Sequence, residues 1–302
     1  MDIKSYSEYT LFRMALSGLR PLPYGWSTAF LRRCARMAGL TMGMRREVVQ
    51  TQLRAVFPEL SVAELAGLTV KVYDHLGLTA AEILFAEPDA LLQSVDIAPG
   101  WDVLDRAMAR GRGVIAATGH IGNFELGGRV LARRFPLLDV VKVQRNAPFD
   151  RFLQEQRLGF GIRTVPTERS GRAVLAHLRS GGLVTLLMDQ DAGKTGFVTD
   201  FLGLPASTWP GAARISIRTG CPVIPLAILR NDDRTHTLHI GEALEPQGLK
   251  DRESDIREFT GRISAAVERF IWDRPEQWFW VHRRWKGAAE AREADESIPG
   301  IQ

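Results

Sequence analysis

From about residue 93 onward, short apolar runs alternate with segments of helical periodicity, and this alternation constrains the fold more than any other feature of the chain. Strands and helices that alternate at this spacing form a mostly parallel sheet flanked by helices. We therefore predict an α/β fold. Strands are expected at 113–118, 139–144, 162–165, 183–188, 222–229 and 236–240, and helices at 100–110, 123–134, 149–158, 170–179, 210–219 and 253–271.

The segment from Tyr9 to Leu40 is the most apolar part of the N-terminal region, but arginines and the Pro21-Leu22-Pro23 turn interrupt it. A transmembrane helix requires about 18 or more uninterrupted apolar residues, so this segment does not qualify. It also lacks the small-residue cleavage site of a signal peptide. We predict two helices that lie in the membrane interface, since arginines alternate with their apolar positions. The alternative is a helical hairpin packed on the rest of the protein.

These patterns divide the chain into three parts. Residues 1–90 form a helical region that is expected to lie at the membrane interface, with further helices at 44–56 and 61–85. Residues 91–287 form the α/β domain. Residues 288–302 are rich in alanine and glutamate and are expected to be a disordered tail.

The overall composition is that of a globular protein, with 45% hydrophobic and 25% charged residues. The formal net charge of +4 is too small to indicate nucleic-acid binding. The two cysteines, Cys34 and Cys221, stand alone, and no His/Cys/Asp cluster has the spacing of a zinc site. Gly193-Lys194-Thr195 lacks the upstream glycine of a phosphate-binding loop. We therefore expect neither a metal nor a bound nucleotide.

A histidine and an acid follow the apolar run Val114–Thr118, in the segment Gly119-His120-Ile121-Gly122-Asn123-Phe124-Glu125. His120 is thus expected at the end of a strand, where open α/β sheets bind ligands, and Glu125 in the first turn of the next helix. A carboxylate on one ring nitrogen fixes the histidine tautomer, so the other nitrogen can take a proton. Such a pair suits an enzyme whose nucleophile is a substrate hydroxyl. The alternative is a helix start, with Glu125 favoured there by the helix dipole.

Four segments in order carry a resemblance to a known family. They are GHIGNFELGG (119–128), VKVQRNAPFDR (141–151), MDQDAGKTGFVTDFLGLPASTWPGAARIS (188–216) and PEQWFWVHRRWK (275–286). Together they resemble blocks of the bacterial late lipid A acyltransferases, the lauroyl and myristoyl transferases of the lysophospholipid acyltransferase superfamily. The resemblance covers roughly residues 10–287, and the last segment is the most specific.

The resemblance implies transfer of a fatty acyl chain from a thioester, on acyl carrier protein or coenzyme A, to a hydroxyl of a lipid A precursor or a similar glycolipid. His120 would act as general base, and Glu125 would orient it. The thioester is a co-substrate, and neither a cofactor nor a metal is expected. The expected partners are acyl carrier protein, the glycolipid and the membrane surface, but not nucleic acid. The expected location is the cytoplasmic face of the inner membrane, as a peripheral or monotopic protein of lipopolysaccharide biosynthesis.

Further residues are candidates for binding substrate. Backbone N–H groups at Gly122 and Asn123 and the Arg145 side chain could stabilise an oxyanion. Arg145 could instead bind a phosphate or a sugar of the acceptor. Asp189 ends a strand at the same edge of the sheet and is expected to line the site, unless it only caps a turn.

The C-terminal cluster that contains Arg283, Arg284 and Trp285 is expected to bind the membrane or the acceptor. Trp278, Trp280 and His282 alternate with their neighbours, which is also compatible with a short strand. The alternative for this cluster is that its aromatic residues pack into the core.

Two other functions stay open. A relative of this family could acylate a phosphatidylinositol mannoside, an ornithine lipid or a lysophospholipid, and the departures at Gln190 and at 207–209 leave the acceptor undecided. The Phe-Pro-Glu-Gly-Thr-Arg-like block of the ordinary glycerolipid transferases is missing, which disfavours a lysophospholipid. A catalytically silent lipid-binding relative is the second possibility, and the intact His120/Glu125 pair argues against it.

Overall fold

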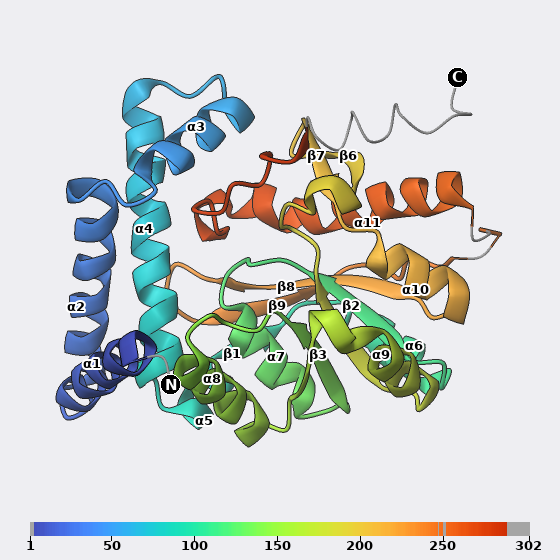
Figure 1. The fold of residues 1–302 in the computed structure, drawn as a ribbon, viewed down its shortest axis with the longest axis horizontal. Coiled ribbons are helices and arrows are strands. Elements are labelled where there is room, and N and C mark those ends of the chain that lie inside the picture. Colours follow the sequence, from blue (N-terminus) through green and yellow to red (C-terminus); the bar gives the residue numbers. More distant parts are fainter. Residues whose placement is uncertain (1–2, 247, 250–251, 289–302) are drawn as a thin grey trace.

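The computed structural model describes residues 3–246, 248–249 and 252–288 (Figure 1). The N-terminal part is helical, as expected, and the proline-containing turn separates its first two helices. Its elements are α1 (Ile3–Leu19), α2 (Tyr24–Arg36), the π-helical turn η1 (Met37–Thr41), α3 (Arg46–Val56), α4 (Val62–Phe85) and α5 (Pro88–Gln93). A capping box begins α4, because Ser61 and Glu64 bond each other's backbone N–H groups.

Within the described residues, the central sheet has seven strands in the order β1-β9-β8-β2-β5-β3-β4. Neighbouring strands are parallel except β8 and β9, which are antiparallel. The predicted mostly parallel α/β fold is confirmed. The strands are β1 (Val95–Ile97), β2 (Val114–Thr118), β3 (Leu137–Val141), β4 (Arg163–Pro166), β5 (Leu183–Leu187), β8 (Val223–Arg230) and β9 (His236–Ile240).

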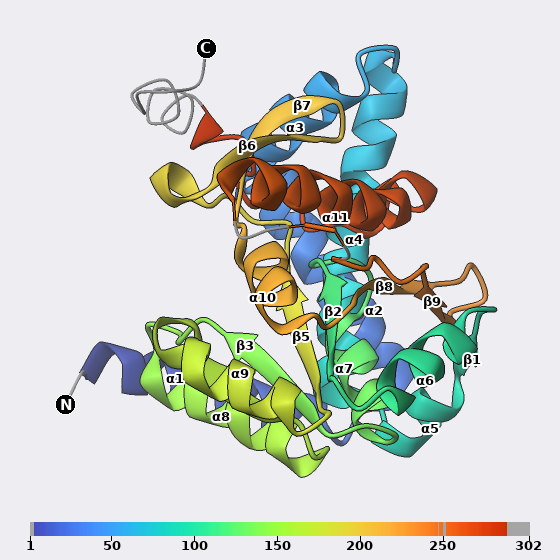
Figure 2. The same ribbon diagram turned by 90° about the vertical axis from the view of Figure 1, so that its right-hand side faces the viewer.

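Helices cover both faces of this sheet, with α11 on one side and α6 and α7 on the other (Figures 1 and 2). Side chains alternate along β2 accordingly. Val114 and Ala116 join the core beneath α6 and α7, whereas Ile115 and Ala117 join the core beneath α11. Burial on both faces explains why the first four residues of β2 are all apolar rather than alternating with polar ones. The helices of this domain are α6 (Trp101–Ala109), α7 (Phe124–Ala132), α8 (Ala147–Gly159), α9 (Ser170–Arg179), α10 (Gly211–Thr219) and α11 (Glu253–Asp273).

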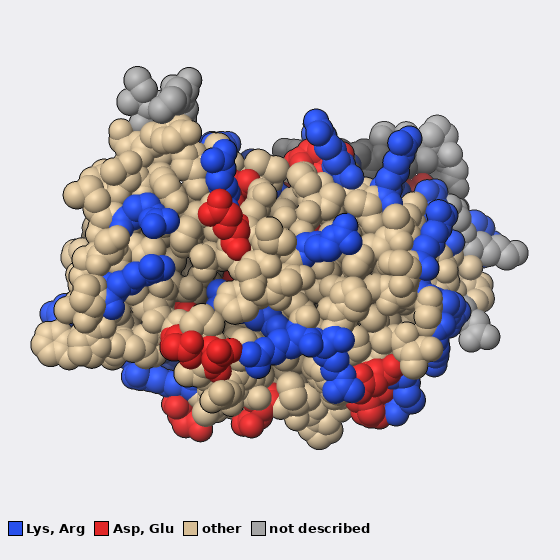
Figure 3. All heavy atoms as spheres, turned by 90° about the horizontal axis from the view of Figure 1, so that it is seen from below, with Lys and Arg blue, Asp and Glu red and all other residues tan. Residues whose placement is uncertain are grey.

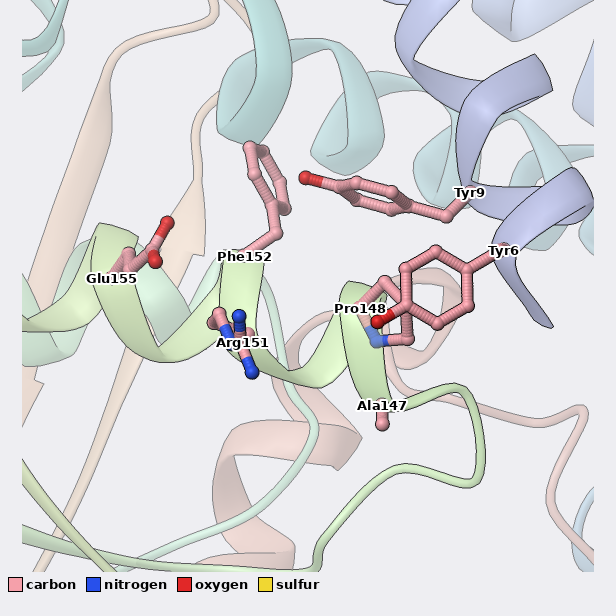
Figure 4. A pocket seen from close by; sticks show the side chains of 7 residues that line it. All are labelled: Tyr6, Tyr9, Ala147, Pro148, Arg151, Phe152 and Glu155. Carbon is pink, nitrogen blue, oxygen red and sulfur yellow. The ribbon is translucent and has the colours of Figure 1, made fainter. Parts of the chain in front are cut away.

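Two N-terminal helices attach to the molecule at different places. Helix α2 packs along α4, where the guanidinium of Arg32 bonds the Asp74 carboxylate at 2.9 and 2.6 Å. Helix α1 packs on α8, where the Phe12 ring meets Phe149 and Phe152 edge-on at 5.3 and 5.5 Å between centroids. Figure 4 shows the tyrosines of α1 facing α8 across a small surface cavity. Among the described residues, the helices are too short or too polar to span a bilayer.

The structure adds elements that the sequence patterns did not predict. A hairpin of β6 (Phe197–Phe201) and β7 (Leu204–Thr208) stands apart from the central sheet. The prediction of a short strand in the segment Trp278–Arg283 is wrong. The N–H groups of Trp280 and His282 donate to carbonyls of the same segment, so its backbone forms turns. Of the expected tail, residues 289–302 lie outside the described residues.

Candidate active site

The loop that follows β2 is clamped on two sides. Gly122 has φ = +60°, and a Cβ at this position would lie 1.7 Å from the Ile228 carbonyl oxygen of β8, so only glycine fits. The Gly122 N–H donates to the Gln277 carbonyl at 2.9 Å, and the Phe279 N–H donates to the His120 carbonyl at 3.1 Å. The position of His120 is therefore fixed by β8 and by the segment 277–279.

Parallel register brings His120 to an acid from the neighbouring strand. Thr118 of β2 pairs with Leu187 of β5, so His120 and Asp189 each lie two residues beyond a paired position. The backbone N–H of His120 donates to Asp189 Oδ2 at 2.7 Å, and Nδ1 of His120 lies 2.9 Å from Asp189 Oδ1. The Trp278 indole donates to the same carboxylate at 2.8 Å. A carboxylate at Nδ1 assigns the ring proton to that atom, so Nε2 is free to accept a proton.

The electrostatics of this pair favour an ionised carboxylate beside a basic imidazole. Burial alone would raise the pKa of Asp189, but the charge and hydrogen bonds of His120, with the bond from Trp278, hold it at about 2. Burial would lower the pKa of His120, but the charge and hydrogen bond of Asp189 outweigh it, with a further contribution from the charge of Glu125. The net pKa of His120 is raised above its ordinary value.

Glu125 does not hold the position that was predicted for it. Arg157 of α8 binds its carboxylate, with Nε donating to Oε2 at 3.1 Å and an Nη2 contact to Oε1. The side chains of this pair are 17% and 14% exposed, so the ion pair is largely shielded from water. Asp189, and not Glu125, orients His120. Glu125 acts on the imidazole only through its charge, because it projects from the first turn of α7 toward α8.

Sequence reasoning missed Arg157. A signal was available, because the predicted helix 149–158 follows a strand of the same sheet and carries this arginine in its last turn. The predicted Arg145 lies on the exposed loop between β3 and α8, and its role stays a prediction.

A small cavity of about 200 Å³ opens beside the imidazole, between α4 and the loop that carries His120 and Gly122. Its lining is mostly apolar, with Leu76, Ala80 and Ile83 on α4 facing Phe124 and Phe279. The His120 ring lies 5.1 Å from the Phe124 ring, centroid to centroid, and 5.8 Å from the Phe279 ring. Such a groove fits hydrocarbon beside a proton acceptor. The side-chain amide nitrogen of Gln190 lies 3.4 Å from Nε2 of His120. Because an amide nitrogen has no basic lone pair, Gln190 cannot take a proton there.

The candidate oxyanion donors at Gly122 and Asn123 are partly occupied. The Gly122 N–H already donates to Gln277, which corrects the expectation that it would face the substrate. The Asn123 side chain is buried, with Oδ1 accepting from the Leu126 N–H at 3.1 Å and Nδ2 donating to Glu82 at 2.9 Å. A substrate contact by the Asn123 backbone N–H stays a prediction.

The C-terminal cluster is mostly internal. Arg284 is fully buried, donates to Thr208 Oγ1 at 2.7 Å and to the Ser207 carbonyl, and lies 4.4 Å over the Phe201 ring. Burial lowers its pKa to about 10. Trp285 is partly buried beside Phe201 and Trp278. The expectation that Arg284 binds membrane or acceptor is therefore wrong, since it fixes the β6–β7 hairpin, and of the three residues only Arg283 is exposed.

No group of three or more His, Cys, Asp or Glu side chains among the described residues could hold a metal ion. The described site is thus a histidine–carboxylate pair at the edge of a mostly parallel sheet, beside an apolar groove. The chain belongs to the bacterial lipid A biosynthesis acyltransferases, whose family model matches residues 2–287. The resemblance found in the sequence is thereby confirmed.

Named relatives are similar over most of the chain. A lipid A biosynthesis palmitoleoyltransferase of Escherichia coli (strain K12) is 26% identical over 270 residues, which cover 88% of this chain and 86% of the relative. A lipid A biosynthesis lauroyltransferase of the same organism is 24% identical over 253 residues, 82% and 81% of the two chains. A phosphatidylinositol mannoside acyltransferase of Mycobacterium tuberculosis (strain ATCC 25618 / H37Rv) is 27% identical over 195 residues, 62% and 58%.

Proposed function

We propose that this acyltransferase moves a fatty acyl chain from acyl carrier protein thioester to a hydroxyl of a lipid A precursor, with His120 as general base. The observation that carries the proposal is the bond between Nδ1 of His120 and Asp189, which leaves Nε2 beside an apolar groove. Relatives named for lipid A support this acceptor.

The proposed reaction starts when Nε2 of His120 takes the proton of the acceptor hydroxyl. The alkoxide oxygen attacks the thioester carbonyl, and the tetrahedral intermediate expels the carrier's thiolate. The imidazolium then returns its proton to the thiolate, so the imidazole is regenerated and the reaction needs no metal or other cofactor. General-base catalysis contributes about 10²–10⁴ in rate. Asp189 stabilises the imidazolium, and the charge of Glu125 acts in the same direction.

The groove beside His120 is proposed to hold the end of the acyl chain next to the thioester. Its walls come from the apolar side chains of α4 and from two phenylalanines, so they exclude water from the reacting carbonyl. Figure 3 shows a hollow in one face of the molecule that is bordered by a band of Lys and Arg and also by acidic side chains.

The N-terminal helices are proposed to rest on the cytoplasmic face of the inner membrane. Helices α1 and α2 and the turn that follows expose large apolar side chains to water, with Trp26 71% exposed and Met42 68% exposed. Apolar surface of this extent commonly marks a membrane or protein contact. Lys and Arg outnumber Asp and Glu in residues 1–60, and basic residues favour an anionic leaflet by about 1 kcal/mol each. Replacing Trp26 by glutamate should reduce the fraction of protein that sediments with anionic vesicles, whereas replacing Glu87 by an uncharged residue should not reduce it.

The central experiment compares lipids from cells that carry the unaltered protein, His120→Ala or the control His239→Ala, by mass spectrometry. His239 is a partly exposed histidine on β9, which is separated from β2 by β8 in the sheet. We expect lipid A species that lack one acyl chain with His120→Ala only. Loss of the chain from another lipid class would refute the lipid A acceptor and favour an alternative such as a phosphatidylinositol mannoside, for which one relative is named. Unchanged lipids with both variants would refute the enzyme and favour a silent lipid-binding protein.

A further inference from the structure

A buried polar cluster joins α4 to β8 behind the catalytic loop. The Arg230 guanidinium donates to both oxygens of Glu82, through Nε at 2.7 Å and Nη2 at 2.6 Å. Its Nη1 lies 2.7 Å from Nδ1 of His75, and Nη2 donates to Thr79 Oγ1 at 3.0 Å. The Glu82 and Arg230 side chains are only 5% and 4% exposed. One arginine thus binds three side chains on successive turns of α4.

The cluster reaches the catalytic loop from two directions. Glu82 Oε2 accepts from Asn123 Nδ2 at 2.9 Å, and Asn123 in turn caps α7 through the Leu126 N–H. The side-chain amide of Gln277 exchanges two hydrogen bonds with the Arg230 backbone, at 2.8 and 2.7 Å. The main-chain carbonyl of Gln277 accepts from the Gly122 N–H. Two adjacent residues that follow His120 are therefore each tied to Arg230 through one intermediate residue, Gly122 through Gln277 and Asn123 through Glu82.

Stability alone does not account for this cluster. Removing two charges from water costs several kcal/mol per ion in real proteins, and well-packed apolar residues are often equally stabilising in such places. Burial by itself would raise the pKa of Glu82, but the bonds from Arg230 and His236 hold it at about 2. Burial and the charge of Arg230 lower the pKa of His75 to about 3, so a neutral imidazole accepts from Arg230. What the cluster supplies is a fixed direction for each bond.

We propose that Glu82 and Arg230 are positioning residues, which hold the His120–Asn123 loop in its reactive geometry and make α4 part of the catalytic unit. The proposal rests on the proposed function, because the loop matters only if His120 reacts. The same turns of α4 carry the apolar wall of the groove, so one buried pair sets both the imidazole and the wall opposite it.

The first test is Glu82→Gln in the full chain, assayed with labelled lauroyl thioester of acyl carrier protein and a lipid A precursor in detergent micelles. Glutamine turns a donor toward Arg230 or toward Asn123 and leaves the loop less constrained. Misplacement by about 1 Å can cost about 100-fold, so we expect kcat to fall about 10- to 100-fold with KM unchanged. Asp74→Asn is the matched control, because it removes a partly exposed ion pair between α2 and α4 and should keep the kcat of the unaltered protein.

The second variant, Asn123→Ser, guards against a failure of Glu82→Gln to fold. Serine keeps an oxygen that can cap α7 but lacks the amide that reaches Glu82. We expect kcat to fall about tenfold, with the acid limb of the pH profile unmoved because Asp189 still holds His120. A kcat equal to that of the unaltered protein in folded Glu82→Gln and Asn123→Ser would overturn the proposal.

Hydrogen exchange separates this inference from the proposed function. In Glu82→Gln, the amides of Gly122 and Leu126 should exchange faster, while those of β2 and β5 keep their protection and Asp74→Asn matches the unaltered protein. Unchanged exchange at both amides would overturn the positioning role, whatever the activity. If the unaltered protein transfers no acyl chain and these two amides still lose protection, the proposed function fails and the positioning of the loop stands.

Discussion

Two carboxylates act on His120, and they are held in opposite ways. Asp189 is 2% exposed, bonds both the ring and the backbone of His120, and receives the Trp278 indole. Glu125 belongs to the same loop–helix segment as His120, yet it is bound by Arg157 of α8. The acid that is near in sequence contributes charge, whereas the acid 69 residues away contributes charge and direction. We call Asp189 with Trp278 the Asp189 side of the site, and Glu125 with Arg157 the Glu125 side.

The difference teaches that sheet order, and not sequence spacing, selects the partner of the histidine. Because β2 and β5 are neighbours in parallel register, residues two positions beyond their paired ends must meet. Glu125 begins a helix that leaves this edge, and its carboxylate meets the next helix instead. Asp189 should therefore control the tautomer of His120, whereas Glu125 should change only the electrostatic potential at the imidazole ring.

The largest expected effect is that of Asp189→Asn. An amide cannot act as a charged acceptor for both N–H groups of His120, and it leaves the imidazolium without its counter-charge. Loss of the orienting acid in a comparable triad costs about 10⁴-fold, so we expect kcat to fall about 10³- to 10⁴-fold. Asp191→Asn is the control, since this acid accepts from the Gly287 N–H rather than from His120. Retention of more than about a tenth of kcat would break the comparison between the two sides.

Glu125→Gln should have a smaller effect, a loss of about 10- to 100-fold in kcat, because only an electrostatic contribution is removed. Arg157→Met should be similarly harmful, since it leaves a shielded carboxylate unpaired. The double variant should lose less than the product of the single losses, because the two residues act as a pair. Steady-state kinetics of the unaltered protein, the two single variants and the double variant measure these losses in kcat. An effect of Glu125→Gln as large as that of Asp189→Asn would give Glu125 a directional role.

The pH profile should separate the same two sides. A general base works when deprotonated, and the pKa of His120 is raised, so the acid limb of kcat/KM should lie above the ordinary histidine value of about 6.5. Asp189→Asn should move this limb to lower pH, and Glu125→Gln should move it in the same direction by less. Direct titration of the His120 ring by NMR checks the assignment. If the acid limb moves more with Glu125→Gln than with Asp189→Asn, the prediction that Asp189 raises the pKa of His120 more than Glu125 does is contradicted.

The sequence was sufficient to predict the strands and helices that build the site, and to predict His120 and Asp189 at one edge of the sheet. Its limit was the strand order, because hydrophobic periodicity does not reveal that β5 lies next to β2. For the partner of Glu125, the sequence shows only a basic residue in the last turn of the predicted helix 149–158, because the packing of that helix against Glu125 depends on the strand order. Arg284 shows a second limit, because a charged residue in a polar-looking motif can be fully buried when a backbone carbonyl, a hydroxyl and an aromatic ring contact it.

The smallest expected effect is a gain in stability on the Glu125 side. Asp139 of β3 lies near this pair, and its Oδ1 is out of contact with water and has no partner among the described residues. Burial, with the nearby charge of Glu125, raises its pKa to about 6. A carboxyl whose pKa is higher in the folded state loses its stabilising protonation as pH rises from about 4 to about 6, so at pH 7 the folded protein carries an unfavourable charge.

Asp139→Asn removes this charge while keeping the shape of the side chain. We expect the free energy of unfolding to increase by about 1–2 kcal/mol at pH 7, and the gain to vanish near pH 4, where the unaltered carboxyl is protonated in the folded state. Urea unfolding at the two pH values measures both numbers. Asp105→Asn serves as the control, because this acid forms an exposed pair with Arg134 and should give little change at either pH. A gain that is equal at both pH values would show that packing, and not the charge of Asp139, limits stability on the Glu125 side.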